Sequence, residues 1–597
     1  MWSAIPASWK STKYIALFKA GDPRNADNYR LIALNATMLK LHEAILLARL
    51  KSIIPDSSLH PHQYGFRPKR ATIDSLYYLL TRIRETLAIG KSKGHIYTAF
   101  IDIQKAFDTV DFNILLLKLW DRGIRGKAWH WIKAYLSNRT FTVSCDNTES
   151  DPFPATNGTP QCAILSPFLF LLFIDDLGRQ IEATGCNIQF FADDIALYPT
   201  ATGAAATEQL QQALAILTQW ADANEIKFNT KKAKSSIVLF SLQPIPAHPT
   251  FVLSGVPLEV EPEYKYLGVW LDTALSFAKH KQATLAKVTA AANIICRLIG
   301  QESTLAPITI RKLVLATVVP IYTYGFHLFQ PTKDYLNKLQ TAIVKPLRNA
   351  LGLPRMTHSL SILAEYNILP PYIQWHFQVA QAAHQLASKP RSVPAANMFT
   401  THTQRVTTHR IKRRRRLKSL HTLQFDSIND LNIPAHRGKP SKRPYEETAT
   451  NDWLSNRHGS ALKNASSNSY MATPPSLPNY LSSLPRKQAS KRAQFRFDTI
   501  SFWRRSTYTK PGVPRVDPFC RLCDSIAVGN ATHLTLQCQA FNPQRLRVRM
   551  LWPANTDFTH DLITANPTTD PASPCSKAIS ILLSAIASRL GKLAAPD

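Results

Sequence analysis

The chain has 597 residues, of which 71 are Lys or Arg and 40 are Asp or Glu, so its formal net charge is +31. The length allows several domains, and the charge favours nucleic acid as a partner over an anionic membrane surface. No run of about 18 apolar residues occurs, so no membrane span is expected. The first residues lack the apolar core of a signal peptide, and eight scattered cysteines fit an intracellular protein without a disulfide framework.

Residues 1–275 alternate apolar runs with polar turns. Helices are predicted for 30–54, 112–124 and 126–136, and strands for 95–103, 141–147 and 265–272. The segment HIYTAFIDI at 95–103 is short, aromatic and β-branched, which is typical of a buried strand. Helices mixed with strands predict an α+β or α/β fold.

Residues 276–385 are predicted to be mostly helical, and the composition changes after about residue 390. Residues 401–445 hold twelve Lys or Arg against Asp426 and Asp430, and Ser, Asn and Pro dominate further on. We therefore expect a basic, partly disordered connector. Its run RIKRRRRLK at 410–418 suits a nuclear-import signal, an RNA-binding arm or a solvated helix face, and charge alone does not separate these roles.

Two apolar segments carry carboxylates at their ends. In YTAFIDIQKAFDTVDF, Asp102 follows the buried strand, and in FFADDIAL, Asp193 and Asp194 stand at an expected hairpin tip. A plain tight turn would account for the Asp-Asp pair, but charges among apolar side chains are costly unless cations offset them. Mg²⁺ prefers carboxylate and phosphate oxygens, and two such ions about 3.5–4 Å apart can stabilise an in-line phosphoryl displacement.

Three segments, FIDIQKAFDTVD, NGTPQCAILSPFLFLLFIDDL and FFADDIAL, resemble in this order the palm motifs of reverse transcriptases. They are most similar to those of non-LTR (LINE-type) retrotransposons. Four further segments resemble this family's opening segment, fingers motif, segment after the first palm motif and primer grip: IALFKAGDPRNADNYRLIAL, HQYGFRPKRATIDSLYYL, GIRGKAWHWIKAYLSNRTFTV and YKYLGVWLD. The resemblance is dense over 1–275 and looser over 276–385.

The resemblance implies an α+β right-hand polymerase. Fingers and a palm with an antiparallel sheet are expected in residues 1–275, and a helical thumb in 276–390. A basic, partly disordered connector at 391–510, a zinc-knuckle-like module at 511–550 and a C-terminal tail at 551–597 would follow.

The family's catalytic roles carry over where the residues match. Asp102, Asp193 and Asp194 would be the catalytic carboxylates, and with the backbone carbonyl of Ile103 they would hold two Mg²⁺ ions, with Mn²⁺ as an alternative. The primer 3′-hydroxyl, made more acidic by one ion, would attack the α-phosphate of the dNTP, and the other ion would hold the triphosphate. This implies an RNA-directed DNA polymerase in nucleus and cytoplasm, whose partners are an RNA template, a DNA primer or target, and dNTPs.

Four residues are implied to bind the nucleotide. Arg67 would pair with the triphosphate, and Phe107 would exclude a ribose 2′-hydroxyl. Gln161 would lie beside the template–nucleotide pair, and Lys232 near the pyrophosphate, with Lys234 as the alternative register. Arg67 could otherwise be a solvated surface arginine, and Phe107 could also belong to the core.

Two positions depart from the family. Cys162 follows Pro-Gln where the family usually has Gly, and a side chain there would hinder the nucleotide or strain the backbone. Leu31 stands where the family usually has Pro. A decayed copy that only binds nucleic acid is therefore the alternative function. Asp108 is expected to cap the helix that follows it rather than to act in catalysis.

A second cluster lies near the C-terminus. CRLCDSIAVGNATHLTLQC places Cys520, Cys523, His533 and Cys538 in a C-x2-C-x9-H-x4-C pattern, whose donors suit a closed tetrahedral Zn²⁺ site. Chance spacing is the alternative. The pattern resembles the C-terminal Cys-Cys-His-Cys motif of the same family. Because all four positions are filled, we expect a structural, nucleic-acid-binding role.

Family members usually carry an endonuclease domain before the polymerase, whereas this chain begins close to the polymerase's opening segment. We therefore expect a polymerase-plus-zinc fragment, from a 5′-truncated copy or a partial gene model. No acidic constellation after residue 275 suggests an RNase H domain. A group II intron-type maturase shares the palm, but YKYLGVWLD and the zinc motif favour the retrotransposon family.

Overall fold

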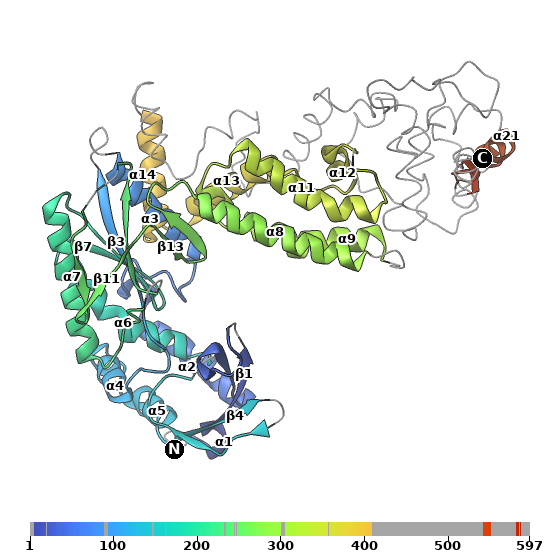
Figure 1. The fold of residues 1–597 in the computed structure, drawn as a ribbon. Helices are drawn as coiled ribbons and strands as arrows, with labels where there is room; N and C mark the ends of the chain where they lie inside the picture. Colours follow the sequence, from blue (N-terminus) through green and yellow to red (C-terminus); the bar gives the residue numbers. More distant parts are fainter. Residues whose placement is uncertain are drawn as a thin grey trace. The chain divides into compact units, whose positions relative to one another are not determined.

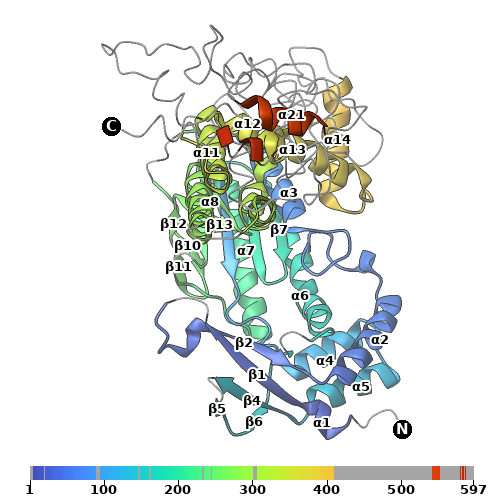
Figure 2. The same ribbon diagram turned by 90° about the vertical axis from the view of Figure 1, so that its right-hand side faces the viewer.

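The structure is a computed structural model that describes residues 5–18, 21–88, 94–145, 148–160, 163–231, 234–243, 245, 247–299, 305–355, 357–408, 541–550, 579, 581–583 and 585–586. The chain divides into two units, Met1–His280 with Gln385–Thr422, and Lys281–His384 with Leu423–Asp597 (Figures 1 and 2). Helices and strands are mixed, which confirms the α+β expectation.

The first unit contains a five-stranded sheet, in the order β12-β9-β3-β8-β7; β3 and β7 of this sheet are labelled in Figure 1. Its strands are β3 (His95–Asp102), β7 (Cys186–Phe191), β8 (Asp194–Pro199), β9 (Ser236–Ser241) and β12 (Val260–Glu261). All neighbours are antiparallel except β12 and β9, which are parallel. The middle strand β3 is buried at every position between its ends, as its aromatic and β-branched residues predict.

Helices cover both faces of this sheet. On one face, α6 and α7 contact strands β7, β8 and β3. On the other face, α3 contacts β3, β7 and β9. Gln189 of β7 lies on the α3 face, where its Nε2 donates to the Ser75 carbonyl at 3.3 Å. The helices of this unit are α1 (Ala7–Lys10), α2 (Thr37–Ile53), α3 (Thr72–Leu87), α4 (Phe112–Asp121), α5 (Gly126–Leu136), α6 (Ser166–Glu182), α7 (Ala204–Ala223) and α14 (Pro394–Thr408).

The two faces of β3 have different neighbours. Ala99 and Ile101 belong to the large apolar core that α6 and α7 share. Phe100 points to the opposite face, where its ring stacks on Tyr264 with centroids 4.7 Å apart. Side chains alternate along a strand, so Asp102 lies on the same face as Phe100.

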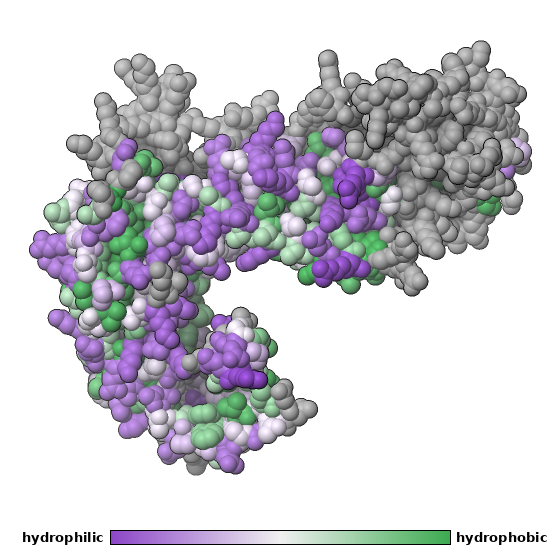
Figure 3. All heavy atoms as spheres, in the orientation of Figure 1, coloured by the Kyte–Doolittle hydropathy of each residue, from purple (hydrophilic) through white to green (hydrophobic). Residues whose placement is uncertain are grey.

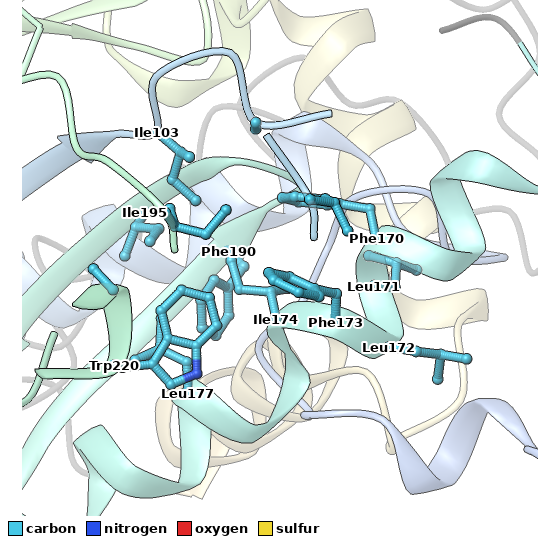
Figure 4. Packing of buried hydrophobic residues seen from close by; sticks show 14 of the residues in the cluster. Ile103, Phe170, Leu171, Leu172, Phe173, Ile174, Leu177, Phe190, Ile195 and Trp220 are labelled. Atoms are coloured by element: carbon cyan, nitrogen blue, oxygen red, sulfur yellow. The ribbon is translucent and has the colours of Figure 1, made fainter. Parts of the chain in front are cut away.

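The most apolar run of the chain forms α6. Twelve of its residues are buried, and Figure 4 shows several of them packed near Trp220 of α7 and Phe190 of β7. Its two aspartates are paired, Asp175 with Arg122 and Asp176 with Lys118. Within the described ranges, no helix is long and apolar enough to cross a membrane. Figure 3 shows hydrophilic residues over much of the visible described surface, as expected when apolar side chains fill the core.

A second sheet has the order β2-β1-β4-β5, with β6 beside β4. Its strands are β1 (Ser11–Phe18), β2 (Tyr29–Leu34), β4 (Arg139–Cys145), β5 (Thr148–Glu149) and β6 (Phe153–Ala155). The helix predicted for 30–54 therefore begins only at Thr37, because the first residues of that segment pair with β1.

Two small hairpins complete the described strands of this unit, β10 (Phe251–Leu253) with β11 (Val256–Leu258), and β13 (Glu263–Tyr266) with β14 (Val269–Asp272). The single strand predicted for 265–272 is wrong. Leu267 and Gly268 both have positive φ, 44° and 85°, and so form the two-residue turn of a hairpin.

The described part of the second unit is helical, as predicted for residues 276–385. Its helices are α8 (Ala278–Leu298), α9 (Pro307–Leu313), α10 (Val319–Thr323), α11 (Lys333–Ala350), α12 (Ser359–Glu365), α13 (Pro371–Ser388) and α21 (Asn542–Met550). A π-helical segment, Val314–Val318, joins α9 to α10 just before Pro320, which has no N–H for a regular helical bond.

After α13 the chain returns to the first unit. Residues 394–408, expected within the connector, form α14, which packs on α3. Lys389 precedes α14 and places its Nζ 2.6 Å from both carboxylate oxygens of Asp74. The basic run 410–418 and the tail from 551 to 578 lie outside the described residues.

Candidate active site

The two adjacent aspartates lie at the tip of a hairpin. β7 ends at Phe191 and β8 begins at Asp194, so Ala192 and Asp193 form the turn. Ala192 has a φ of 59°. Two-residue hairpin turns need a positive φ at this first position, where glycine is usual and alanine is strained. The backbone is therefore strained immediately before Asp193.

Asp102 ends β3 and lies opposite Asp194 in the antiparallel register. Residues opposite one another project to the same face, so the two carboxylates share the face of Phe100, and Asp193 is next to them in the turn. Asp102 Oδ2 accepts a hydrogen bond from Asn229 Nδ2 at 3.1 Å and lies 3.8 Å from Lys234 Nζ. The fold brings the three predicted catalytic acids to one end of the sheet.

Ile103 continues β3 in an antiparallel bridge to the segment after α7. The hydrogen bonds of that bridge join Gln104 N to Lys227 O at 2.9 Å and Asn229 N to Asp102 O at 2.8 Å. Backbone groups alternate between the two sides of a strand, so the carbonyl of Ile103 is directed toward β8. That is the side on which the hairpin carries its aspartates.

The carboxylates disfavour one another's ionisation. Burial, followed by the charges of Asp193 and Asp102, raises the pKa of Asp194 to about 7 against the pull of Lys234. Burial, and then the charge of Asp102, also raise the pKa of Asp193. A cation placed among them would offset both effects.

The donor set suits a hard divalent ion. Among the described residues, no three His, Cys, Asp or Glu side chains lie close enough together to hold a metal ion as they stand. Three carboxylates and a backbone carbonyl are nevertheless the oxygen donors that Mg²⁺ and Mn²⁺ prefer. Asp102, Asp193, Asp194 and the carbonyl of Ile103 therefore fit the expected metal by their chemistry.

Arg67 is buried, so it is not the solvated surface arginine that was its alternative interpretation. Its side chain is 2% exposed and forms a fork with Asp56, from Nε to Oδ1 at 2.8 Å and from Nη2 to Oδ2 at 2.7 Å. Nη1 donates to the carbonyls of His60 and Gln63. Every nitrogen of the guanidinium is thus engaged by protein oxygens.

Phe107 lies between two other rings. Its centroid is 4.9 Å from Phe170 of α6 and 6.1 Å from Phe66, which meets it edge-on. Phe66 is 54% exposed and has a φ of 54°, a strained value for a bulky residue. Phe107 is therefore joined to the core on one side and to an exposed aromatic on the other.

Residues 19–271 match the family described as reverse transcriptase (RNA-dependent DNA polymerase). The chain is 28% identical to a probable RNA-directed DNA polymerase from transposon BS of Drosophila melanogaster, over 61% of this chain and 41% of the relative. It is 31% identical to the RNA-directed DNA polymerase from mobile element jockey of the same species, over 59% and 38%. Residues 19–271 are thus similar to reverse transcriptases, which confirms this part of the expected resemblance.

The chain spans about two fifths of the length of these curated relatives. Among solved structures, apo telomerase from Candida tropicalis matches with a TM-score of 0.33 and 10% identity, over 70% of this chain and 68% of that one. At that score the likeness carries no argument.

Several expected site residues lie outside the residues that the structure describes. These are Gln161, Cys162 and Lys232, and the zinc-ligand candidates Cys520, Cys523, His533 and Cys538. Lys234, the alternative to Lys232, is described and lies beside Asp102.

The expected helix cap at Asp108 is wrong. The N-cap of α4 is Asp111, whose Oδ1 accepts from Asn113 N at 2.8 Å and Ile114 N at 2.9 Å. Sequence reasoning also missed Asn229, which contacts Asp102, and Gln63, which contacts the β7–β8 turn. Both belong to segments that the sequence marks, NTKKAKSS and HQYGFRPKR, but nothing local indicates what their side chains touch.

Proposed function

We propose that this chain is an RNA-directed DNA polymerase that adds dNTPs to a primer 3′-hydroxyl on an RNA template. One observation carries the proposal: Asp102 and Asp194 lie opposite each other on one sheet face, with Asp193 in the adjoining turn, within the region that matches reverse transcriptases. The names of the partly covered relatives support the same reaction. In this proposal the first unit forms fingers and palm, and the second a thumb.

Asp102, Asp193, Asp194 and the carbonyl of Ile103 would hold two Mg²⁺ or Mn²⁺ ions. When bound, such ions make the 3′-hydroxyl more acidic and offset the charge of the triphosphate and the leaving pyrophosphate. Asn229 orients Asp102 by its amide, and Lys234 places a positive charge beside the same carboxylate.

Nucleotide selection would fall to Phe107, with Gln161 beside the template pair. Phe107 is fixed by Phe170 and Phe66, so it could not move aside for a 2′-hydroxyl. Lys232 or Lys234 would lie near the phosphates, and Lys234 lies 3.8 Å from Asp102 Oδ2. Arg67 supports the loop that carries Phe66 instead of binding the triphosphate.

For the C-terminus we propose a structural Zn²⁺ site that binds nucleic acid, formed by Cys520, Cys523, His533 and Cys538. Its support is the ligand spacing. Metal analysis of the purified chain should find about one zinc per chain, and Cys523→Ser should remove it. Unchanged zinc content in that variant would refute the site.

Polymerisation is tested with the full chain, a primed RNA template, dNTPs and Mg²⁺. Primer extension should require the metal and be abolished by Asp193→Asn. Asp121→Asn, on the exposed end of α4, is the matched control and should extend primers normally. Folded wild-type protein that extends no primer with Mg²⁺ or Mn²⁺ would refute the proposal.

Cys162 favours a second candidate, a decayed polymerase that binds nucleic acid only. This candidate predicts salt-sensitive RNA binding that Asp193→Asn leaves unchanged, without any synthesis. Cys162→Gly separates the two, because a gain of synthesis would identify the cysteine as the lesion.

A further inference from the structure

Residues 62–65 lie against the catalytic hairpin like an additional strand. Phe190 N donates to the His62 carbonyl at 3.0 Å, and Tyr64 N donates to the Phe190 carbonyl at 2.8 Å. Gln63 and Phe190 form a parallel bridge. The backbone of this segment is therefore fastened to β7 two residues before the strained turn.

The side chain of Gln63 reaches the turn itself. Its Oε1 accepts from Ala192 N at 3.1 Å and from Gly65 N at 2.8 Å. Both partners are donors, which fixes the oxygen of the amide on this side. Gln63 is 3% exposed, so without Oε1 the buried N–H of Ala192 would lose its partner.

Gly65 permits this close approach. A Cβ added at Gly65 would overlap the backbone nitrogen of Ala192 and come within 3.0 Å of its Cα. Only glycine at position 65 lets residues 62–65 lie this close to the turn. The glycine contact and the Gln63 hydrogen bond therefore converge, independently, on Ala192.

The nitrogen end of the Gln63 amide shows that this side chain does not serve stability alone. Nε2 is buried and has no hydrogen-bond partner among the described residues. A buried donor without a partner is destabilising, and an apolar side chain of the same shape would avoid that cost. What the glutamine provides in return is the oxygen that holds Gly65 and Ala192.

We infer that Gln63 is a positioning residue that holds Ala192 in its left-handed conformation and so orients Asp193 for divalent metal binding. The inference rests on the proposed function, because Asp193 is the residue it serves. Gln63 touches neither metal nor substrate in this role. It acts through the backbone of the turn.

The test compares Gln63→Met, which keeps the side-chain length but removes the acceptor, with Gln189→Met. Gln189 is an equally buried glutamine on β7 that bonds to α3 instead of the turn. Hydrogen exchange of peptides covering 190–194, Mn²⁺ binding by electron paramagnetic resonance, and kcat and KM for dNTP are measured in the full chain.

In Gln63→Met the turn amides should exchange faster, Mn²⁺ should bind more weakly, and kcat should fall about 10- to 100-fold with KM changed less than about threefold. Adding Ala192→Gly to Gln63→Met relieves the backbone strain, so it should recover part of the lost Mn²⁺ affinity and part of the lost kcat. Gln189→Met should change none of these readouts by a comparable factor. If Gln63→Met does not fold, Gln63→Glu replaces it, and its retained acceptor should keep the turn amides protected.

Unchanged exchange and Mn²⁺ binding in Gln63→Met would overturn the inference, as would equal losses in Gln189→Met or unprotected turn amides in folded Gln63→Glu. An inactive wild type would instead refute the proposed polymerase. The exchange and Mn²⁺ measurements would still decide the role of Gln63.

Discussion

Asp102 and Asp194 face each other directly across the antiparallel pairing of β3 and β8. Like charges in opposite positions destabilise a sheet, and here burial and the neighbouring carboxylates raise the pKa of Asp194 to about 7. The metal-free fold therefore carries an electrostatic cost at this end of the sheet. Either a proton or a divalent cation can offset that cost.

Metal-free protein should lose stability as the pH rises. The pKa of Asp194 is raised from 3.8 to about 7 on folding, so the folded state binds this proton more tightly. The resulting stabilisation is complete below the unfolded pKa and is lost as the pH rises through about 7. Thermal unfolding in EDTA from about pH 5 to about pH 8 measures it.

Asp194→Asn should flatten this pH dependence, and Mg²⁺ added to the wild type at the alkaline end should restore stability. A wild-type slope that persists in Asp194→Asn would assign the pH dependence to another group.

Asn229→Leu should lower kcat about tenfold, because it frees the carboxylate of Asp102 from the amide 3.1 Å away. The fold should persist, since the backbone bond from Asn229 N to Asp102 O does not involve the side chain. Primer extension and thermal unfolding measure the two effects. Asn113→Leu, on the exposed side of α4, is the control. Equal activity in the two variants would show that Asp102 needs no such support.

The sequence predicted the parts of the site that depend on local pattern. Apolar flanks around Asp193 and Asp194 indicated a hairpin tip, and the buried strand before Asp102 was correctly bounded to within a residue. Local patterns also predicted the helices within residues 276–385. These features follow from periodicity and burial cost, which act over a few residues.

The features that the sequence did not reveal depend on contacts between distant segments. Gln63 and Ala192 are 129 residues apart, and only the folded sheet brings them together. Arg67 matched a motif, but its partner Asp56 depends on how the loop between them closes. Asp111 is the α4 cap because its backbone, with φ −69° and ψ 132°, is extended as a cap requires. The sequence alone does not show which of the nearby acids, Asp108 or Asp111, has that backbone conformation.

Arg67→Lys should lower the free energy of unfolding by about 1–3 kcal/mol, because an ammonium cannot replace the fork to Asp56 and the carbonyl bonds at once. Urea unfolding measures this loss, and KM for dNTP in the folded variant should change less than about threefold. In a double-mutant cycle, the effects of Asp56→Asn and Arg67→Lys on the free energy of unfolding should be strongly coupled. A large rise in KM without a loss of stability would instead show that Arg67 binds the triphosphate.

Lys389→Met should be strongly destabilising. It removes the partner of Asp74, whose side chain is 4% exposed, and leaves a buried carboxylate unpaired. Breaking a buried pair in this way costs about 3–5 kcal/mol, and the loss should fall at the low end because Asp74 still accepts a bond from Ala71 N. Urea unfolding and limited proteolysis of α14 measure the global and the local effect.

Lys338→Met is the matched control for Lys389→Met, since its pair with Asp334 is exposed and should contribute less than about 1 kcal/mol. Asp74→Asn combined with Lys389→Met should recover part of the loss, because the buried charge is removed along with its partner. If the two lysine variants were equally stable, the docking of α14 on α3 would depend on apolar contacts such as Tyr77 with Phe399 rather than on the buried pair.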